Sequence, residues 1–89
     1  MNREVVYMAE ARQDLRRLDK KTASRIMRKL DGFSEREGEF GKLLRNLPSD
    51  IVGLRSYRIG NYRAIFRLTD EEIKVYIIEH RSKVYRKLR

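Results

Sequence analysis

The first half of the chain has a strand-like segment followed by helical periodicity. Residues 2–8 carry β-branched and aromatic side chains at their centre, as strands commonly do. Apolar residues then recur three or four positions apart, first over residues 8–18 and again over residues 23–33, with basic residues off these stripes. In the polar turn between them, Asp19 or Thr22 can cap the second helix. We therefore expect an N-terminal strand and an antiparallel hairpin of two amphipathic helices.

The second half alternates between apolar and polar side chains with period two. Strands are predicted at residues 54–59, 62–68 and 73–79. Gly60-Asn61 is expected to form a tight turn between the first two strands, and residues 38–53, with three glycines and the only proline, are expected to connect the helices to the strands. The predicted order is β-α-α-β-β-β. This is an α+β fold with the helices on one face of a three-stranded antiparallel meander and the other face open.

Length and composition exclude several classes of protein and site. A chain of 89 residues supports one core, so we expect a single domain over residues 1–89. The absence of cysteine and the presence of one histidine exclude disulfides, thiolate zinc sites and histidine-cluster metal sites, and we expect no metal and no cofactor. No apolar run approaches the roughly 20 residues of a membrane-spanning helix. We expect a cytoplasmic protein without a signal peptide or a membrane partner.

Positive charge is the strongest feature of the composition. The chain carries 22 Lys and Arg against 13 Asp and Glu, which gives a net charge of +9. The surplus is concentrated in residues 55–69, with four Arg and no acidic residue, and in residues 79–89, with five basic residues and one Glu. Because 15 of the basic residues are Arg, which binds phosphate through two hydrogen bonds and stacks on bases, the surplus favours a nucleic-acid partner.

The basic residues of the second half are predicted to meet at one side of the sheet. In the strand at 62–68, Arg63 and Arg67 alternate with the apolar residues that face the helices, so both point to the open face. Arg58 lies in the preceding strand. Directly beyond the last strand come His80, Arg81, Lys83 and Tyr85. We expect a cleft formed by Arg58, Arg63 and this last group; the plainer interpretation, in which the charged side chains are only solvated, stays open because charge alone indicates no more than an anionic partner.

Two blocks of sequence resemble the RelE/ParE toxin superfamily. Residues 48–67 contain Tyr-Arg-Ile-Gly-Asn-Tyr-Arg at 57–63, and residues 78–86 contain His-Arg followed by Val-Tyr-Arg. The resemblance extends over nearly the whole chain and implies the toxin of a type II toxin–antitoxin pair. RelE-type members are metal-independent endoribonucleases that cut mRNA in the ribosomal A site with the RNA's own 2′-hydroxyl as nucleophile. The implied partners are the ribosome, mRNA and an acidic RelB-like antitoxin, with which family members commonly form heterotetramers.

The resemblance also implies roles for individual residues. Arg63 and Arg81 match arginines that stabilise charge on the reacting phosphate, and Tyr85 matches a tyrosine that acts as an acid or base or stacks on a base. His80 is added to the predicted catalytic set because it is the only side chain with an unperturbed pKa near neutrality. The predicted RNA-binding residues are Arg58, Arg55, Arg67, Lys83 and Arg86.

The general base and the branch of the superfamily stay open. Well-known RelE members carry lysines where this chain has Leu54 and Ser56. The base is therefore open between Lys83, His80, Tyr85 and no base at all, and the YoeB-like scheme would pair His80 with a glutamate such as Glu79. ParE members share the fold but inhibit DNA gyrase without cleaving RNA, which is the alternative function. A third possibility is a basic nucleic-acid-binding module without toxicity.

Overall fold

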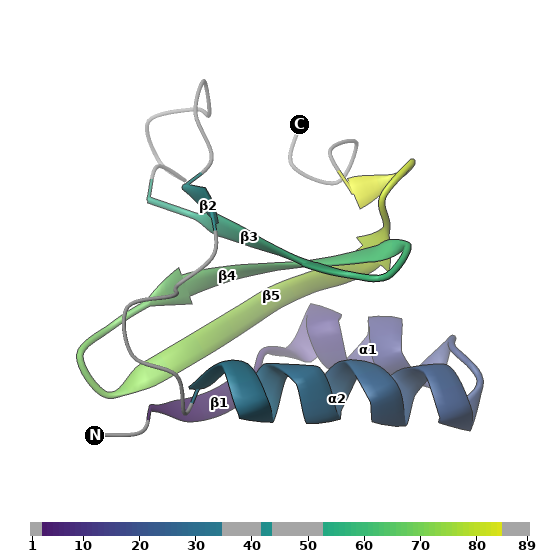
Figure 1. Cartoon of the computed structure of the whole chain (residues 1–89), viewed down its shortest axis with the longest axis horizontal. Coiled ribbons are helices and arrows are strands. Elements are labelled where there is room, and N and C mark those ends of the chain that lie inside the picture. Colours follow the sequence, from purple (N-terminus) through teal and green to yellow (C-terminus); the bar gives the residue numbers. More distant parts are fainter. Residues whose placement is uncertain (1–2, 35–41, 44–52, 85–89) are drawn as a thin grey trace.

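The computed structural model describes residues 3–34, 42–43 and 53–84. Its elements follow in the order β1 (Glu4–Tyr7), α1 (Ala9–Arg16), α2 (Lys20–Ser34), β2 (Lys42–Leu43), β3 (Arg55–Ile59), β4 (Tyr62–Leu68) and β5 (Glu72–His80). The predicted strand, helical hairpin and meander are all present, so the predicted α+β fold is confirmed (Figure 1). In this part of the chain, no helix has the length and apolar character needed to cross a membrane.

The strands form one mixed sheet in the order β1-β5-β4-β3-β2. β3, β4 and β5 pair antiparallel as predicted, whereas β1 pairs with β5 in parallel. β2 pairs antiparallel with β3 and lies in the segment predicted to be a connection. A strand of two residues is too short to show alternation, so only its pairing with β3 reveals it.

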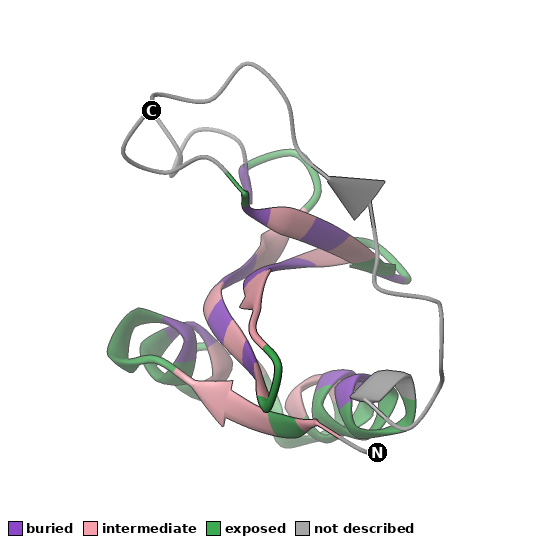
Figure 2. Ribbon diagram, turned by 90° about the vertical axis from the view of Figure 1, so that its left-hand side faces the viewer, coloured by how far each residue is buried: buried purple, intermediate pink, exposed green. Residues whose placement is uncertain are grey.

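The main core lies between the helices and one face of the sheet. α1 contributes Ala11 and α2 contributes Ile26 and Leu30. Figure 2 shows that the buried parts of both helices lie on the sides facing the sheet. The strands contribute Ile59, Ala64, Phe66, Ile73, Val75 and Ile78. The helix stripes read from the sequence therefore face the sheet through Ala11, Ile26 and Leu30, whereas Met8 and Met27 are exposed. Burial of these stripes against the sheet stabilises both helices, which alone would be marginal.

Asp19 caps the start of α2, one of the two caps predicted. The backbone N–H of Thr22 donates to Oδ2 of Asp19 at 3.3 Å, and the Thr22 hydroxyl donates to Oδ1 at 2.6 Å. These hydrogen bonds favour the carboxylate, so they lower the pKa of Asp19, the hydroxyl contributing most. The cap satisfies a backbone donor of the first helical turn and sets the end of the short connection from α1.

A β-bulge in β5 changes which side chains share a face. Ile65 of β4 is in register with Ile77, but the next residue, Phe66, is in register with Val75, so Tyr76 has no partner in the ladder. The predicted cleft needed His80 on the open face with Arg63. That prediction is wrong, because the unpaired residue reverses the direction of the side chains that follow it, so His80 shares the face of Val75 and lies opposite to Ile77.

The face away from the helices, here called the distal face, is partly covered rather than open. Leu54, Ile65, Ile77 and Val84 form a second buried cluster there, with Tyr76 packed against it. Val84 belongs to the segment after β5, which Figure 1 shows on the opposite side of the sheet from the helices. This apolar cluster occupies the centre of the distal face, and polar residues lie at the two ends of that face.

Asp14 of α1 is a buried carboxylate that completes the edge of the sheet. The side chain is only 4% exposed, and its Oδ2 accepts the backbone N–H of Ile78 at 2.9 Å. β1 pairs with β5 only as far as Tyr7 and Val75. Beyond that point the Asp14 carboxylate, in place of a neighbouring strand, accepts a backbone N–H of β5. Without this acceptor the buried donor would destabilise the fold.

Candidate functional site

Arg63 lies at the centre of a polar group on the distal face. In the antiparallel ladder it is in register with Arg58 of β3 on one side and with Glu79 of β5 on the other. Residues in register on neighbouring strands point to the same face, so the three side chains form a row across the sheet. Nη1 of Arg63 also donates to the hydroxyl of Ser56 at 3.0 Å. Ser56 is 3% exposed, so this bond anchors one end of a guanidinium group that is itself half-buried.

The tight turn between β3 and β4 brings further arginines to the end of this row. Gly60 has φ of +60°, a conformation that suits glycine, and its carbonyl accepts Nε of Arg58 at 3.2 Å. On the helix side, a Cβ atom at Gly60 would lie 3.0 Å from Nη2 of Arg25, so this guanidinium lies directly over the turn. The carbonyl of Asn61 accepts the backbone N–H of Arg81 at 2.8 Å.

His80 is not on the same face as Arg63. It is in register with Tyr62, and the two rings meet edge to face with centroids 5.6 Å apart. Tyr62 packs against the main core, so His80 lies on the helix side. Its Nδ1 accepts the backbone N–H of Ser82 at 3.2 Å and lies 2.9 Å from the Ser82 hydroxyl.

The other predicted residues are dispersed. Arg55 is in register with Phe66 and shares the helix-side face. Arg67 does lie on the distal face, but near Gly53 at the far end, beyond the buried Ile65. Lys83 is exposed in the turn after β5. Tyr85 and Arg86 lie outside the described residues. The structure thus brings together Arg58 and Arg63, with Arg81 close to the turn, and separates them from His80, Arg55 and Arg67.

Glu79 and Arg25 belong to the site region, and sequence reasoning gave them little or no weight. Strict alternation is misleading for Glu79, because the bulge at Tyr76 decides its face. The run of four apolar residues from Val75 to Ile78 is the signal of that irregularity, since a half-buried strand alternates. Arg25 lies on the solvent-exposed side of α2, off the apolar stripe. It reaches the β3–β4 turn only through tertiary packing, which no local sequence pattern shows. Among the described residues, no group of three or more His, Asp or Glu side chains is placed to hold a metal ion.

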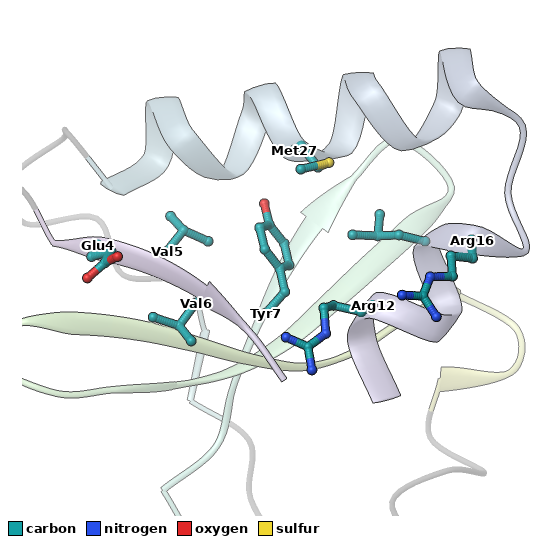
Figure 3. Close-up of a pocket in the computed structure, with 8 residues that line it drawn as sticks. Glu4, Val5, Val6, Tyr7, Arg12, Arg16 and Met27 are labelled. Carbon is teal, nitrogen blue, oxygen red and sulfur yellow. The ribbon is translucent and has the colours of Figure 1, made fainter. Parts of the chain in front are cut away.

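A groove of about 440 Å³, here called the β1 groove, lies between β1 and the helices and shares no residue with the row Arg58–Arg63–Glu79. Val5, Val6, Tyr7, Leu15 and Met27 give it an apolar floor, with Arg12 and Arg16 at one end and Glu4 at the other (Figure 3). The two exposed large apolar residues of the described chain, Met8 and Met27, lie next to or in it. The hydroxyl of Tyr7 points toward α2 and is buried without a hydrogen-bond partner.

Tyr7 is expected to make the protein less stable in strong alkali. Burial, with a smaller contribution from the carboxylate of Asp31, raises its pKa from 10.0 to about 12. The unfolded chain therefore loses this proton at lower pH than the folded chain, and the free energy of unfolding should fall between pH 10 and about 12 but not below pH 10. Tyr7→Phe should show a smaller fall over this interval. Absorbance titration of the tyrosines in both proteins checks the raised pKa of Tyr7. The assignment is wrong if the tyrosine that is missing from the Tyr7→Phe titration is one with a pKa near 10.

Comparison with known proteins assigns the chain to a family. A family model described as the ParE toxin of the type II toxin–antitoxin system parDE matches residues 5–85. The chain belongs to the RelE/ParE toxin superfamily. It is 33% identical over 86 residues to toxin RelG of Mycobacterium tuberculosis, a match that covers 93% of this chain and 95% of RelG. This chain is therefore the toxin of a type II toxin–antitoxin system.

Solved structures of toxin–antitoxin complexes share the toxin's fold. The RelBE2 complex of Mycobacterium tuberculosis aligns with a TM-score of 0.79 and 27% identity, covering 92% of this chain and 94% of the other. A ParDE system of P. aeruginosa aligns with a TM-score of 0.66 and 16% identity over 88% and 95% of the two chains. An E. coli RelE mutant in complex with a RelB peptide aligns with a TM-score of 0.66 and 19% identity, covering 98% of this chain and 94% of the other. At such identities, the last two show the fold alone.

Proposed function

We propose that the toxin is an endoribonuclease that cleaves mRNA in the ribosomal A site without a metal ion, by attack of the RNA's 2′-hydroxyl on the adjacent phosphate. The observation that carries this proposal is the row Arg58–Arg63–Glu79 on the distal face. It combines two guanidinium groups, which can bind a phosphate, with a carboxylate, which can accept a proton. Phosphoryl transfer of this kind needs little else from a protein than positioning and charge.

Arg63 has the central role in the proposed reaction. Its guanidinium, held by Ser56, would bind the non-bridging oxygens of the scissile phosphate and stabilise the extra charge of the phosphorane. Arg58, exposed and one strand away, would hold the neighbouring backbone phosphate. Arg81, at the same end of the sheet, would add charge on the side of the turn.

Glu79 is our candidate for the general base. Among the described residues it supplies the carboxylate in register with Arg63, and its Oε1 already accepts the backbone N–H of His80 at 3.0 Å. In the proposed step the carboxylate takes the 2′-hydroxyl proton, a bond forms from the 2′-oxygen to phosphorus, and the bond from phosphorus to the 5′-oxygen breaks. The departing 5′-oxygen then takes a proton, for which Tyr85 stays the predicted donor.

The partners follow from charge and from the family. A net charge of +9 attracts the ribosome and mRNA over distances beyond contact. The same charge suits an acidic RelB-like antitoxin, and the RelBE2 and RelE structures are themselves complexes with antitoxins. We propose such an antitoxin as the partner that neutralises the toxin in the cytoplasm, as a heterotetramer. The apolar floor of the β1 groove, with Arg12 and Arg16 at one end, suits an amphipathic acidic segment.

Inhibition of DNA gyrase is the second candidate function. The observation that favours it is the family model itself, which describes the ParE toxin of parDE and matches residues 5–85. In that case Arg63 and Glu79 would be surface residues of a binding protein, with no reaction to perform. Two parallel assays of the purified toxin separate the candidates: cleavage of mRNA on programmed ribosomes, and supercoiling by gyrase. We expect cleavage with supercoiling intact, and the reverse result would replace the proposal with the alternative.

A further inference from the structure

We propose that the toxin has a second RNA-binding surface, a groove along α2 that continues from the Arg63 site around the β3–β4 turn and binds the sugar-phosphate backbone. The inference rests on the proposed function, because it takes the distal face to be where the cleaved RNA lies. It adds a binding surface for RNA outside the cleaved codon, made of residues that belong to neither the predicted catalytic nor the predicted RNA-binding set.

The groove is lined by basic side chains. Its volume is about 510 Å³, and the described residues that line it are Lys21, Arg25, Arg28 and Lys29. All four are exposed on one side of α2. Successive turns of the helix separate Lys21, Arg25 and Lys29 by about 6 Å each, so the cations extend for about 12 Å. An array of this length and sign favours an extended anionic chain over a single small ion.

The turn between β3 and β4 joins this groove to the site on the distal face. Arg25 lies over Gly60, within 3.0 Å of where its Cβ would be, and the carbonyl of the same glycine accepts Nε of Arg58. Arg58 is in turn in register with Arg63. Basic side chains therefore follow one another from the groove, over the turn, to the proposed reaction centre. The absence of a side chain at Gly60 is what lets the guanidinium of Arg25 approach the backbone so closely.

The chemistry of the two grooves distinguishes RNA from a protein segment. The groove beside Tyr7 has an apolar floor and exposed methionine, which suits a protein partner. The described residues that line the α2 groove are all basic, and the alkyl parts of their side chains supply its apolar surface. Arginine recognises phosphate through two parallel hydrogen bonds. Continuity with Arg63 then makes the sugar-phosphate backbone of RNA the occupant that the arrangement favours.

Binding to an uncleavable RNA tests the proposal. A fluorescein-labelled RNA hairpin with 2′-O-methyl groups throughout cannot supply the nucleophile, so it reports affinity alone. The variant is Arg25→Ala/Arg28→Ala, and the control is Arg17→Ala/Lys20→Ala, which removes the same charge from exposed positions outside both grooves. Thermal unfolding of both variants verifies that they are folded. Titrations at several salt concentrations give the affinity and the number of phosphate contacts.

We expect the Arg25/Arg28 variant to bind the hairpin about tenfold more weakly or worse, and the control less than about threefold. The slope of log affinity against log salt should fall by about 1 to 2 in the variant. Equal losses in both variants would overturn the proposal in favour of general charge attraction. Polyglutamate, titrated in the same way, stands in for an acidic protein segment. If the Arg25/Arg28 variant loses affinity for polyglutamate but not for the RNA hairpin, the proposal would be overturned in favour of an acidic protein partner.

Failure of this inference differs from failure of the proposed function. If the toxin cleaves mRNA on ribosomes and the Arg25/Arg28 variant binds the hairpin like wild type, the α2 groove is not an RNA site but the proposed function stands. If the toxin cleaves no RNA in any assay, yet the Arg25/Arg28 variant alone loses the hairpin, the groove binds RNA and the proposed function fails.

Discussion

Arg63→Ala is expected to lower the rate of mRNA cleavage on programmed ribosomes by about a hundredfold or more. Loss of one preorganised charge donor to a developing oxyanion typically costs a factor of about 100 to 1,000. Here the guanidinium is also held by Ser56 and lies between Arg58 and Glu79, so its loss removes the central cation of the row. Single-turnover cleavage of a defined message measures the chemical step, and growth of cells that express the variant reports toxicity.

Two further variants make the Arg63 result specific. Arg63→Lys keeps the charge but loses the planar fork, so it should recover only part of the rate. Lys74→Ala removes a cation from the same face of the sheet at the other end, where the side chain pairs with Glu72 at 3.9 Å, and should cleave like wild type. Full activity in Arg63→Ala would remove the assigned role of this residue, as would an equal loss in Lys74→Ala.

Asp14→Ala is expected to lower the free energy of unfolding by about 3 kcal/mol. The substitution removes a buried hydrogen bond to a charged group and leaves the N–H of Ile78 without that partner. Asp14→Asn keeps an oxygen acceptor at nearly the same place and should lose clearly less. Urea unfolding of the three proteins, with amide hydrogen exchange at Ile78, measures both effects.

The Asp14 bond also links the edge of the sheet to the site. Ile78 directly precedes Glu79, so opening of this stretch of β5 would move the carboxylate away from Arg63. We therefore expect Asp14→Ala to exchange its Ile78 amide faster than Asp14→Asn even when both are folded. Equal stability of Asp14→Ala and wild type would contradict the assigned structural role of this carboxylate.

The fold was predictable because local patterns determine most of it. The alternation in β3 and β4 and the two helical stripes each follow from burial of one face. The two-residue turn at Gly60-Asn61 fixes the register of its hairpin, and with it the pairing of Arg58 and Arg63. Pairings between distant segments have no such local sign. The parallel position of β1 beside β5 and the addition of β2 to β3 depend on the whole fold.

The site was predictable only in part, for the same reason. Arg63 and Arg58 lie together because a local turn sets their positions. His80 and Glu79 exchange faces relative to strict alternation, because Tyr76 drops out of the ladder. Arg25 reaches Gly60 across the molecule, and its place on the exposed side of a helical stripe indicated solvation. Family resemblance supplied roles for residues, but it could not supply these contacts.

The most direct test of the central claim is to map the RNA ends produced on ribosomes programmed with a defined message. The proposed attack by the 2′-hydroxyl predicts cuts in the A-site codon that leave a 2′,3′-cyclic phosphate and a 5′-hydroxyl, absent on free mRNA and lost in Arg63→Ala. A message that stays intact on toxin-treated ribosomes, or cuts that leave a 5′-phosphate and a 3′-hydroxyl, would contradict the proposed function.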